Sequence, residues 1–400
     1  MSNQLAMKTN QSSVMNTYAR FPITLVKGKG SFVWDENNEQ YLDFTSGIAT
    51  CSLGHVPEFV HDKLQEQLSL LWHCSNLYHI PSQEKLAKLL IEKSFDGQVF
   101  FCNSGAEANE ALIKLARQHA EINGKVSRKI ITFKHSFHGR TLAALSATGQ
   151  EKLQKGFAPL VEGFQHLEFN SFEALKELES IDACGVLLEL VQGEGGVNPA
   201  NKEWVLELAK ICKKNNLLLM LDEIQTGIGR TGTLFAYQQY NIVPDVMSLA
   251  KGLGSGFPIG AIIASNEVAQ SFKPGSHGST FGGNPLATTA GLATVQYVVD
   301  QEIAQQAHKL GNYLSEKLKE LQKEYAQIKQ VKGLGLLIGV VFEGSALDVV
   351  KKLLAKKVLV LTAGENVLRI LPPLTASTEE IDLFIQTLGQ VLAEESLIVG

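Results

Sequence analysis

One lysine lies in the middle of a long apolar stretch. Residues 242–263 read IVPDVMSLAKGLGSGFPIGAII, and a cluster of glycines begins immediately after Lys251. A charged lysine is costly in apolar surroundings, so Lys251 either lies on the surface or has a chemical reason to be inside. A lysine whose pKa is lowered by burial and by nearby cations is a nucleophile toward carbonyl compounds. Lys251 is therefore our candidate nucleophile.

An aspartate ends the apolar run that precedes this stretch. The residues LLLML lead directly into Asp222, and Gln225 follows three positions later. A carboxylate at the end of so apolar a segment needs a partner. Asp222 could simply cap the next turn, or it could hold a cationic ring nitrogen, and Gln225 could reach the same ring.

Small residues follow a further apolar run, VFFC. The chain continues with Asn103, Ser104, Gly105 and Ala106, and then a helical pattern opens at Glu107. Free backbone N–H groups at a helix N-terminus bind anions, and small residues allow close approach. The lysine of a nucleotide-binding P-loop is missing, so the alternatives are a phosphate cup of another kind or an ordinary turn.

The segment HSFHGRT places an aromatic ring and a cation together. Phe137 could cover a planar ring and Arg140 could grip a carboxylate, although a core aromatic and a surface arginine are the more common roles. His135 and His138 have no carboxylate or cysteine beside them, so we predict no metal site.

Two more polar segments complete the set of candidates. Glu194 follows a buried run in VQGEGG, where it could pair with an arginine or be solvated. Ser279 and Thr280 lie at the centre of PGSHGSTFGGNPLA, which is either a surface loop or a second phosphate or substrate contact that reaches a neighbouring subunit.

Taken together, these segments favour a pyridoxal phosphate enzyme. Such an enzyme needs a lysine that forms a Schiff base, a carboxylate on the pyridinium nitrogen and a phosphate cup. Lys251, Asp222 and the turn after VFFC supply these three features in one region of the chain. In open α/β sheets, ligands bind at the carboxyl ends of strands, which is where all three are expected.

Short apolar runs alternate with helix-length segments from about residue 99 to residue 263. This alternation predicts an α/β domain with a mainly parallel, buried sheet. From about residue 296 the pattern changes to a long charged helix followed by helix–strand–strand–helix, which indicates a smaller α+β unit. A β-hairpin predicted at residues 31–47 should pack with that unit, because it could bury little surface alone. We therefore divide the chain into residues 1–45, 46–295 and 296–400.

The overall composition excludes several function classes. The net charge of the 400 residues is −5, which makes nucleic acid and anionic membranes poor partners. The sequence has no apolar run long enough to span a bilayer, and its first twenty residues do not resemble a signal peptide. The five cysteines are widely spaced and suit reduced thiols, so we expect a cytoplasmic protein.

The same motifs, in the same order, resemble those of class III aminotransferases. The matching segments are NSGAEANE, FHGRT, QGEGG, DEIQTGIGRTG, AKGLGSGFPIGA, GSHGSTFGGNPLA and VLRILPPLTASTEEID, and the likeness covers most of residues 20–390. The resemblance implies fold type I of the pyridoxal phosphate enzymes. This fold has a large domain with a mainly parallel seven-stranded sheet and a smaller α+β domain formed from both termini.

The resemblance also implies roles for the candidates. Lys251 would hold the cofactor as a Schiff base and move the proton, and Asp222 would keep the pyridine nitrogen protonated. Gln225 would contact the phenolic oxygen of the ring and Phe137 would stack on one face. The phosphate would be held by Ser104, Gly105 and Ala106, together with Thr280 of the partner subunit, because the sites of this family lie at a homodimer interface.

Substrate recognition is implied in the same way. Arg140 would bind the α-carboxylate of an N-acylated donor and one carboxylate of 2-oxoglutarate, and Arg369 would bind the other carboxylate. Glu194 would neutralise Arg369 while the donor is bound, and Ser279 would contact the donor. The segments LWHCSNLYHIP and GSHGSTFGGNPLA resemble the bacterial acetylornithine branch more than the ornithine branch.

The expected reaction is amino transfer from N2-acetylornithine to 2-oxoglutarate, a step of arginine biosynthesis. Ornithine, succinylornithine, succinyl-diaminopimelate and 4-aminobutyrate remain alternative donors, because the same core motifs serve all of them. A glutamate-semialdehyde aminomutase would need no 2-oxoglutarate. A regulatory descendant without activity would be expected to lose Lys251 or Asp222, and the chain has both.

Overall fold

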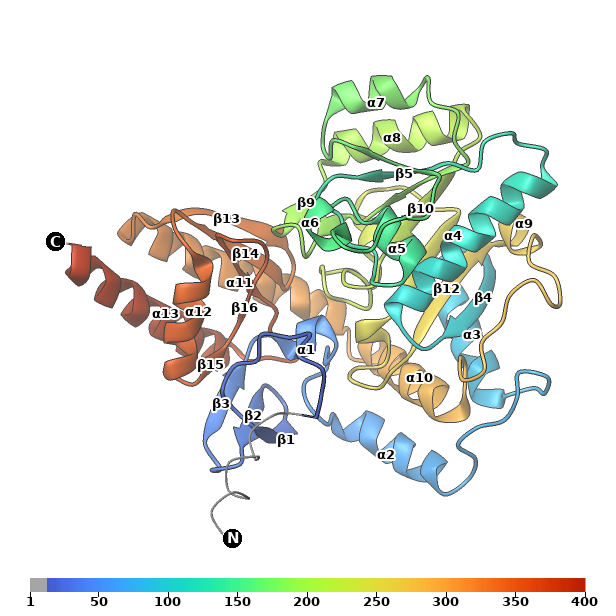
Figure 1. Ribbon diagram of the computed structural model, residues 1–400. Coiled ribbons are helices and arrows are strands. Elements are labelled where there is room, and N and C mark those ends of the chain that lie inside the picture. The colour runs from blue at the N-terminus through green and yellow to red at the C-terminus, as the bar shows by residue number, and fades with distance from the viewer. Residues whose placement is uncertain (1–12, 400) are drawn as a thin grey trace, which may run out of the picture.

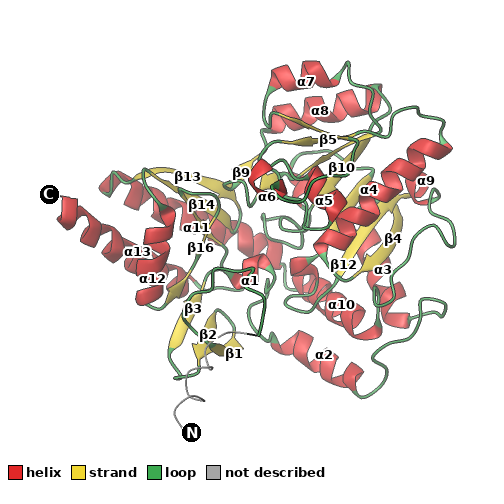
Figure 2. Ribbon diagram, viewed as in Figure 1, coloured by secondary structure: helices red, strands yellow, loops and turns green. Residues whose placement is uncertain are grey.

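The computed structural model describes residues 13–399, and for residues 395–399 only the backbone. Residues 1–12, the first part of the predicted N-terminal arm, lie outside the described residues. A large unit with a central sheet lies beside a smaller unit that contains both ends of the described chain (Figure 1). Figure 2 shows that helices surround the strands in both units.

The large unit is built on a seven-stranded sheet in the order β4-β12-β11-β10-β7-β5-β6. Strand β12 runs antiparallel to both of its neighbours, and the other pairs are parallel. The strands are β4 (Gly97–Cys102), β5 (Ile130–Phe133), β6 (Phe164–Leu167), β7 (Gly185–Leu188), β10 (Leu218–Asp222), β11 (Val246–Leu249) and β12 (Gly260–Ser265). The predicted mainly parallel α/β sheet is confirmed.

Both faces of this sheet are covered, which explains its uninterrupted apolar runs. On β10, Leu218 and Met220 pack in the cluster formed with α4 (Gly105–Ile122), whereas Leu219 and Leu221 pack in the cluster that contains Trp204 of α8 (Lys202–Lys214). Alternate residues of a strand face opposite sides, so a strand covered on both sides is apolar throughout. The other helices of this unit are α2 (Glu58–Leu68), α3 (Pro81–Lys93), α5 (Leu142–Ala147), α6 (Glu151–Gln154), α7 (Phe172–Leu178), α9 (Asn266–Ala269) and α10 (Pro285–Asp300).

The smaller unit combines two four-stranded sheets, β13-β14-β17-β16 and β1-β2-β3-β15. Strand β3 pairs in parallel with β15, with Leu42 opposite Val358, so the two ends of the chain share one sheet. The predicted hairpin is confirmed as the antiparallel pair β2 and β3. The strands are β1 (Leu25–Lys29), β2 (Phe32–Asp35), β3 (Gln40–Asp43), β13 (Ile328–Leu334), β14 (Leu337–Phe342), β15 (Val358–Leu359), β16 (Leu361–Thr362) and β17 (Val367–Ile370), and the helices are α11 (Ile303–Glu324), α12 (Ala346–Ala355) and α13 (Thr378–Val399).

A short left-handed turn, α1 (Ser46–Ala49), joins the hairpin to the large unit. The φ angles of Ser46, Gly47, Ile48 and Ala49 are 46°, 60°, 63° and 61°. This region is unfavourable for residues other than glycine, so the turn needs support from its surroundings. The carboxylate of Asp43 accepts the N–H groups of Thr45 and Ser46 at 2.8 and 3.2 Å, and the Ser46 hydroxyl donates to the Leu371 carbonyl at 2.6 Å.

Two features complete the fold. Strands β8 (Val191–Gln192) and β9 (Asn198–Pro199) form a small separate ribbon after β7. Within residues 13–399, none of the helices has the length and apolar character needed to cross a bilayer.

Candidate active site

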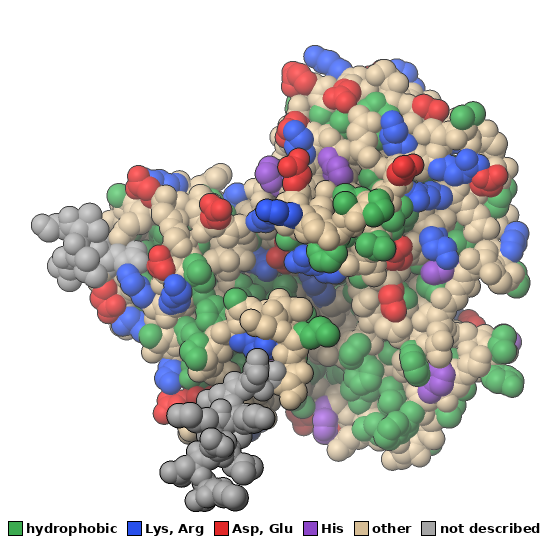
Figure 3. Space-filling model, in the orientation of Figure 1, with side chains coloured by type: hydrophobic (Ala, Val, Ile, Leu, Met, Phe, Trp, Pro, Cys, Tyr) green, Lys and Arg blue, Asp and Glu red, His purple; other side chains and the backbone are tan. Residues whose placement is uncertain are grey.

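A cavity of about 410 Å³ lies where strands β4, β5, β7, β10 and β11 end. Its walls come from the segments that follow these strands and from Thr50, the residue after the left-handed turn. Figure 3 shows the hollow between the large unit and the N-terminal hairpin. The lining residues from the predicted set are Ser104, Gly105, Ala106, Phe137, Arg140, Glu194, Asp222, Gln225 and Lys251. Nine of the predicted residues therefore lie at one cavity, as expected from their positions after the ends of strands.

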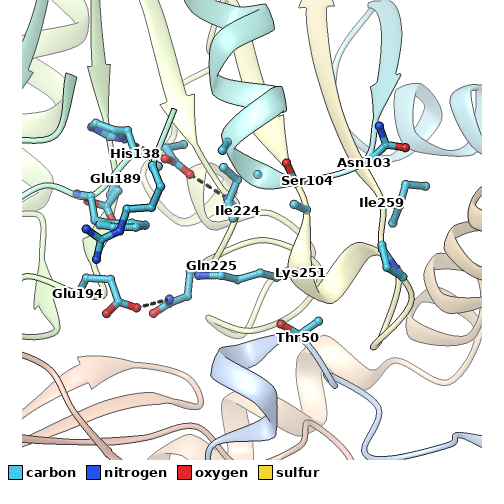
Figure 4. A pocket seen from close by; sticks show the side chains of 18 of the residues that line it. Thr50, Asn103, Ser104, His138, Glu189, Glu194, Ile224, Gln225, Lys251 and Ile259 are labelled. Carbon is cyan, nitrogen blue, oxygen red and sulfur yellow. Dashed lines mark hydrogen bonds and ion pairs between the residues drawn. The ribbon is translucent and has the colours of Figure 1, made fainter. Parts of the chain in front are cut away.

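Lys251 extends into this cavity from the end of β11. Its backbone is in the left-handed region, with φ 44°, and its side chain points toward the wall that contains Gln225 and Glu194 (Figure 4). Burial lowers the pKa of Lys251, and the nearby charge of Arg369 lowers it further, against the opposing effect of Glu194. A lysine in this setting releases its proton more readily than one on the surface.

Asp222 is held by a chain of buried hydrogen bonds. One carboxylate oxygen accepts the side-chain amide of Asn109 at 2.7 Å and lies 2.8 Å from Nδ1 of His138. The other accepts the N–H of Ile224 at 3.1 Å. Asn109 is held in turn by the Ser248 hydroxyl at 2.7 Å. The carboxylate is thereby fixed in direction at the floor of the cavity.

The α4 N-terminus forms an anion cradle. Ser104 is its N-cap residue and accepts the N–H of Glu107 at 3.2 Å, while Gly105 and Ala106 begin the helix. A Cβ on Gly105 would lie 2.9 Å from the Ile224 side chain, so only glycine permits the observed approach of α4 to the loop after β10. Because the first N–H groups of a helix have no partner within it, this terminus can bind a phosphate.

Arg369 and Glu194 form an ion pair between the two units. Arg369 lies on β17 and is only 2% exposed, and its Nη1 donates to Glu194 and to the carbonyl of Gly193. Gln225 donates to the same Glu194 oxygen at 3.4 Å. Burial alone would raise the pKa of Glu194, but the charge of Arg369 and its hydrogen bond hold that pKa below its usual value.

Arg140 lies at the edge of the cavity and remains exposed. Its guanidinium lies 5.5 Å from the centre of the Phe137 ring. The site therefore contains one exposed arginine, and one buried arginine that is already paired with a carboxylate.

Ser279 and Thr280 are not brought to the Lys251 cavity within one chain. They line a separate hollow of about 360 Å³, together with Asn103 and Phe281. Ser279 accepts the N–H of Gly282 at 2.9 Å and the side-chain amide of Asn103 at 3.3 Å.

Two buried polar residues of the site, Glu189 and Asn109, were not singled out from the sequence, and a third, His138, was considered there only as a metal ligand. Glu189 follows β7 and accepts the N–H of Phe137 at 2.9 Å, and burial, with the charge of Asp222, raises its pKa well above the usual value. Asn109 and His138 hold Asp222. The sequence did contain signals that could have identified two of them. Glu189 is an acid inside the apolar run GVLLELV, and Asn109 is an asparagine on the apolar face of α4.

The residues around the cavity fit pyridoxal phosphate. The cavity contains a lysine with a lowered pKa and a fixed carboxylate, and its anion cradle admits no larger residue at Gly105. Phe137 provides an aromatic face, and Nε2 of the buried His138 has no hydrogen-bond partner.

Comparison with known proteins gives a consistent result. The sequence model of the family described as "Aminotransferase class-III" matches residues 13–392. An acetylornithine aminotransferase of Oceanobacillus iheyensis is 56% identical over 384 residues, which cover 96% of each chain. The acetylornithine aminotransferase of Bacillus subtilis is 47% identical over 389 residues, covering 97% of this chain and 99% of the relative.

Solved structures show the same fold. The N-acetylornithine aminotransferase of Stenotrophomonas maltophilia aligns with a TM-score of 0.83 and 35% identity, covering 95% of this chain and 98% of that one. The ornithine aminotransferase of Toxoplasma gondii aligns with a TM-score of 0.92 and 32% identity, covering 96% and 93%.

Proposed function

This chain belongs to the class III aminotransferase family and is a transaminase that uses pyridoxal phosphate, and we propose that its amino donor is N2-acetyl-L-ornithine. The acceptor is 2-oxoglutarate, and the products are N-acetyl-L-glutamate 5-semialdehyde and L-glutamate. The reaction belongs to arginine biosynthesis. The observation that carries the proposal is the placing of two arginines: Arg140 is exposed at the edge of the cavity, and Arg369 is buried behind the lining residue Glu194, which neutralises it.

Bound pyridoxal phosphate supplies an electron-withdrawing ring that stabilises negative charge on the carbon next to the amino nitrogen. The residues that would hold it are Lys251, Asp222 and the α4 N-terminus, with Gln225 beside the ring and Phe137 over one face. Lys251 is the residue that moves the proton, because its Nζ points into the cavity and its lowered pKa lets it act as a base.

The Asp222 carboxyl group is held at a fixed point. Its two side-chain partners, Asn109 and His138, orient the carboxylate, so it can keep a ring nitrogen protonated without reorganising. Glu189 lies in the same wall, and burial together with the charge of Asp222 raises its pKa, so a second negative charge beside Asp222 is disfavoured.

The two arginines suit two substrates of different charge. An acetylated donor has one carboxylate, which Arg140 can bind while Glu194 neutralises Arg369. 2-Oxoglutarate has two carboxylates, and its second one can replace Glu194 on Arg369. Free ornithine adds an ammonium group, whose removal from water near two arginines is unfavourable. The near full-length likeness to acetylornithine aminotransferases supports the same choice.

Titration of the purified holoenzyme tests this proposal. N-acetylornithine should bleach the visible absorption of the bound cofactor, and 2-oxoglutarate should restore it. We expect kcat/KM for N-acetylornithine to exceed that for ornithine by at least about tenfold, which corresponds to about 1.4 kcal/mol. Equal or faster turnover of ornithine, of a succinylated analogue or of 4-aminobutyrate would reassign the donor while leaving the cofactor argument intact.

We also propose a homodimer with shared active sites. The segment between α2 and α3 exposes Leu70, Trp72, Leu77 and Tyr78 at 77%, 63%, 88% and 70%, and Phe281 is 61% exposed. Asn76 in that segment donates to the carbonyls of Ser279 and Gly282, so the two loops form one apolar surface. Exposed apolar surfaces of this kind mark protein–protein interfaces.

In such a dimer, Ser279 and Thr280 would enter the site of the partner subunit. Light scattering should give a dimer, and Trp72→Glu should shift the enzyme toward the monomer and reduce its affinity for the cofactor. A Trp72→Glu variant that stayed dimeric with unchanged cofactor binding would place the interface elsewhere.

Two further assignments belong to the proposal. We assign residues 1–45 and 296–400 to the small domain and residues 46–295 to the large one, supported by the pairing of β3 with β15 and by the contact of Phe44 with Phe384. We place the enzyme in the cytoplasm, because all five cysteines are free thiols, which suits a reducing compartment.

A further inference from the structure

A buried arginine that does not line the Lys251 cavity joins the large unit to the smaller one. Arg230 follows β10 in the segment DEIQTGIGRTG and is only 2% exposed. Its Nη1 donates to the backbone carbonyls of Leu336 and Pro372, at 3.0 and 2.5 Å. The Leu336 N–H donates in return to the Arg230 carbonyl at 3.0 Å. One residue of the large unit therefore holds two positions of the smaller unit.

The guanidinium of Arg230 is costly to bury. Burial lowers the pKa of Arg230 to about 9, which leaves the group charged at neutral pH. No carboxylate of residues 13–399 is hydrogen-bonded to it, and its Nε and Nη2 have no hydrogen-bond partner among these residues. A buried charge without an acidic partner is unfavourable, so the bonds that Arg230 does make have to offset this cost.

The two carbonyls that Arg230 holds belong to the strand pair that carries Arg369. In the antiparallel pair of β14 and β17, Gly339 lies opposite Arg369. Continuing this register places Leu336 opposite Pro372, just beyond the end of the ladder. Arg230 therefore joins the two chains at their common end, three positions along the chain from Arg369.

The turn between β13 and β14 fits tightly against the backbone of Arg230. Gly335 in this turn has φ 57°, and a Cβ on it would lie 2.5 Å from the carbonyl carbon of Thr231 and 2.7 Å from the carbonyl oxygen of Arg230. On the other side, a Cβ on Gly311 of α11 would lie 2.3 Å from the carbonyl oxygen of Gly335. The turn is thus enclosed by backbone on both sides.

The segment that contains Arg230 is itself fixed in the large unit. Glu223, near its start, accepts the N–H of Ala236, beyond its end, at 2.7 Å. Gln225 in the same segment accepts a hydrogen bond from Nη1 of Arg369 at 3.4 Å. This segment therefore contacts the β17 region at two points, the Arg369 side chain through Gln225 and the backbone after the strand through Arg230.

The two arginines proposed to bind substrate carboxylates lie on different units. Arg140 follows β5 of the large unit, whereas Arg369 lies on β17 of the smaller unit. A dicarboxylate of fixed length can contact both only if the two units are held at the right separation.

We propose that Arg230 is a positioning residue for Arg369, and that it holds β17 where Arg369 can bind the second carboxylate of a dicarboxylate substrate. This inference rests on the proposed function, which gives Arg369 that carboxylate. Arg230 itself touches no substrate and acts through the carbonyls of Leu336 and Pro372.

The test uses the holoenzyme and two unreactive probes, glutarate and pentanoate, which share a chain length but have two carboxylates and one. Calorimetry gives the dissociation constant of each probe. Arg230→Met should weaken glutarate binding at least about tenfold, because the charged hydrogen bond to the second carboxylate is lost, and change pentanoate binding by less than about threefold. In the glutamate half-reaction, kcat/KM should fall by a similar factor, mainly through a higher KM.

Two further variants show whether the effect belongs to Arg230. Arg230→Lys keeps a charged donor on a shorter group, so its affinity for glutarate should lie between those of the wild type and Arg230→Met. Lys332→Met is the matched control, because it removes another hydrogen bond between the units, from Lys332 of β13 to Asn198 at 2.7 Å. It should leave the binding of both probes unchanged.

Arg369→Met separates this inference from the proposed function. If that variant bound glutarate as tightly as the wild type, Arg369 would not hold the second carboxylate, and both would fail. Weak glutarate binding in Arg369→Met together with unchanged binding in a folded Arg230→Met would overturn the inference alone.

Other results would overturn the inference as well. Equal weakening of glutarate and pentanoate in Arg230→Met would indicate a general loss of structure, and a selective loss of glutarate in Lys332→Met would show that any loosening of the units is enough. If Arg230→Met did not fold, Arg230→Lys would decide, and unchanged glutarate binding in it would refute the positioning role. The binding constants do not depend on which amino donor the enzyme uses.

Discussion

The ion pair between Arg369 and Glu194 gives the sharpest test of how the site admits two substrates. In the wild type, an acetylated donor leaves the pair intact, whereas glutamate and 2-oxoglutarate must displace Glu194 to bind Arg369. Replacing Glu194 by glutamine keeps the shape but removes the charge. The dicarboxylates then no longer compete with a carboxylate of the protein.

The size of the effect follows from the contact. Nη1 of Arg369 donates to Glu194 in a site where Arg369 is only 2% exposed. A hydrogen bond between charged groups contributes about 1.5–3 kcal/mol, and each 1.4 kcal/mol is about tenfold in an equilibrium constant. In Glu194→Gln, kcat/KM for glutamate should therefore rise about 10- to 100-fold, while that for N-acetylornithine stays within about threefold.

The two half-reactions can be measured separately. Each amino donor is mixed alone with the holoenzyme, and the visible absorption of the cofactor gives the rate. Glu207→Gln on the surface of α8 is the control for loss of one negative charge, and thermal unfolding checks that Glu194→Gln is folded. If both donors changed by the same factor, Glu194 would not be neutralising Arg369, and the argument from the two arginines would fail.

Three further predictions concern the cavity and the core. Lys251→Ala should bind pyridoxal phosphate only reversibly, which absorption after dialysis measures. Its turnover rate should fall about 10²–10⁴-fold or more, and normal turnover would exclude Lys251 as the base. Asn109→Ala removes one hydrogen-bond donor from Asp222, so it should lower the stability by about 1–3 kcal/mol and lower kcat, and Ser248→Ala should have a milder effect. An unchanged melting curve and kcat would show that Asn109 does not hold Asp222. Burial raises the pKa of Glu223 from 4.5 to about 7, so the folded state holds this proton more tightly than the unfolded state and stability falls as pH rises through that window. Glu223→Gln should lessen the fall in Tm over the same pH range in calorimetry, and an identical fall would refute the assignment.

Much of the fold could be predicted because each strand of the large sheet carries its own signal. Runs such as LLLML are apolar throughout, since α4 covers one face and α8 the other. Their ends then place Lys251, Asp222 and Ser104 together, because parallel strands end at one edge.

Other parts depend on contacts that no local pattern contains. Arg369 meets Glu194 only because β17 is paired in register with β14 and the small unit packs on the large one. The left-handed turn was not predicted, because serine, isoleucine and alanine do not favour that backbone region and only Gly47 does. It is Asp43 and Leu371 that hold it. Asn109 and Glu189 needed the tertiary structure, since their function comes from the groups they touch.

The pairing of β3 with β15 has a consequence for the newly made chain. Tyr41 of β3 and Lys357, the residue before β15, are hydrogen-bonded although 316 residues separate them. At about 5–20 residues per second, a ribosome takes about 15–60 s to cover that distance. During this time the hairpin presents the free edge of β3, and such an edge can pair with other chains. Assembly of the smaller unit is therefore a late, long-range event in synthesis, whereas the central sheet of the large unit can form before the ribosome reaches α11.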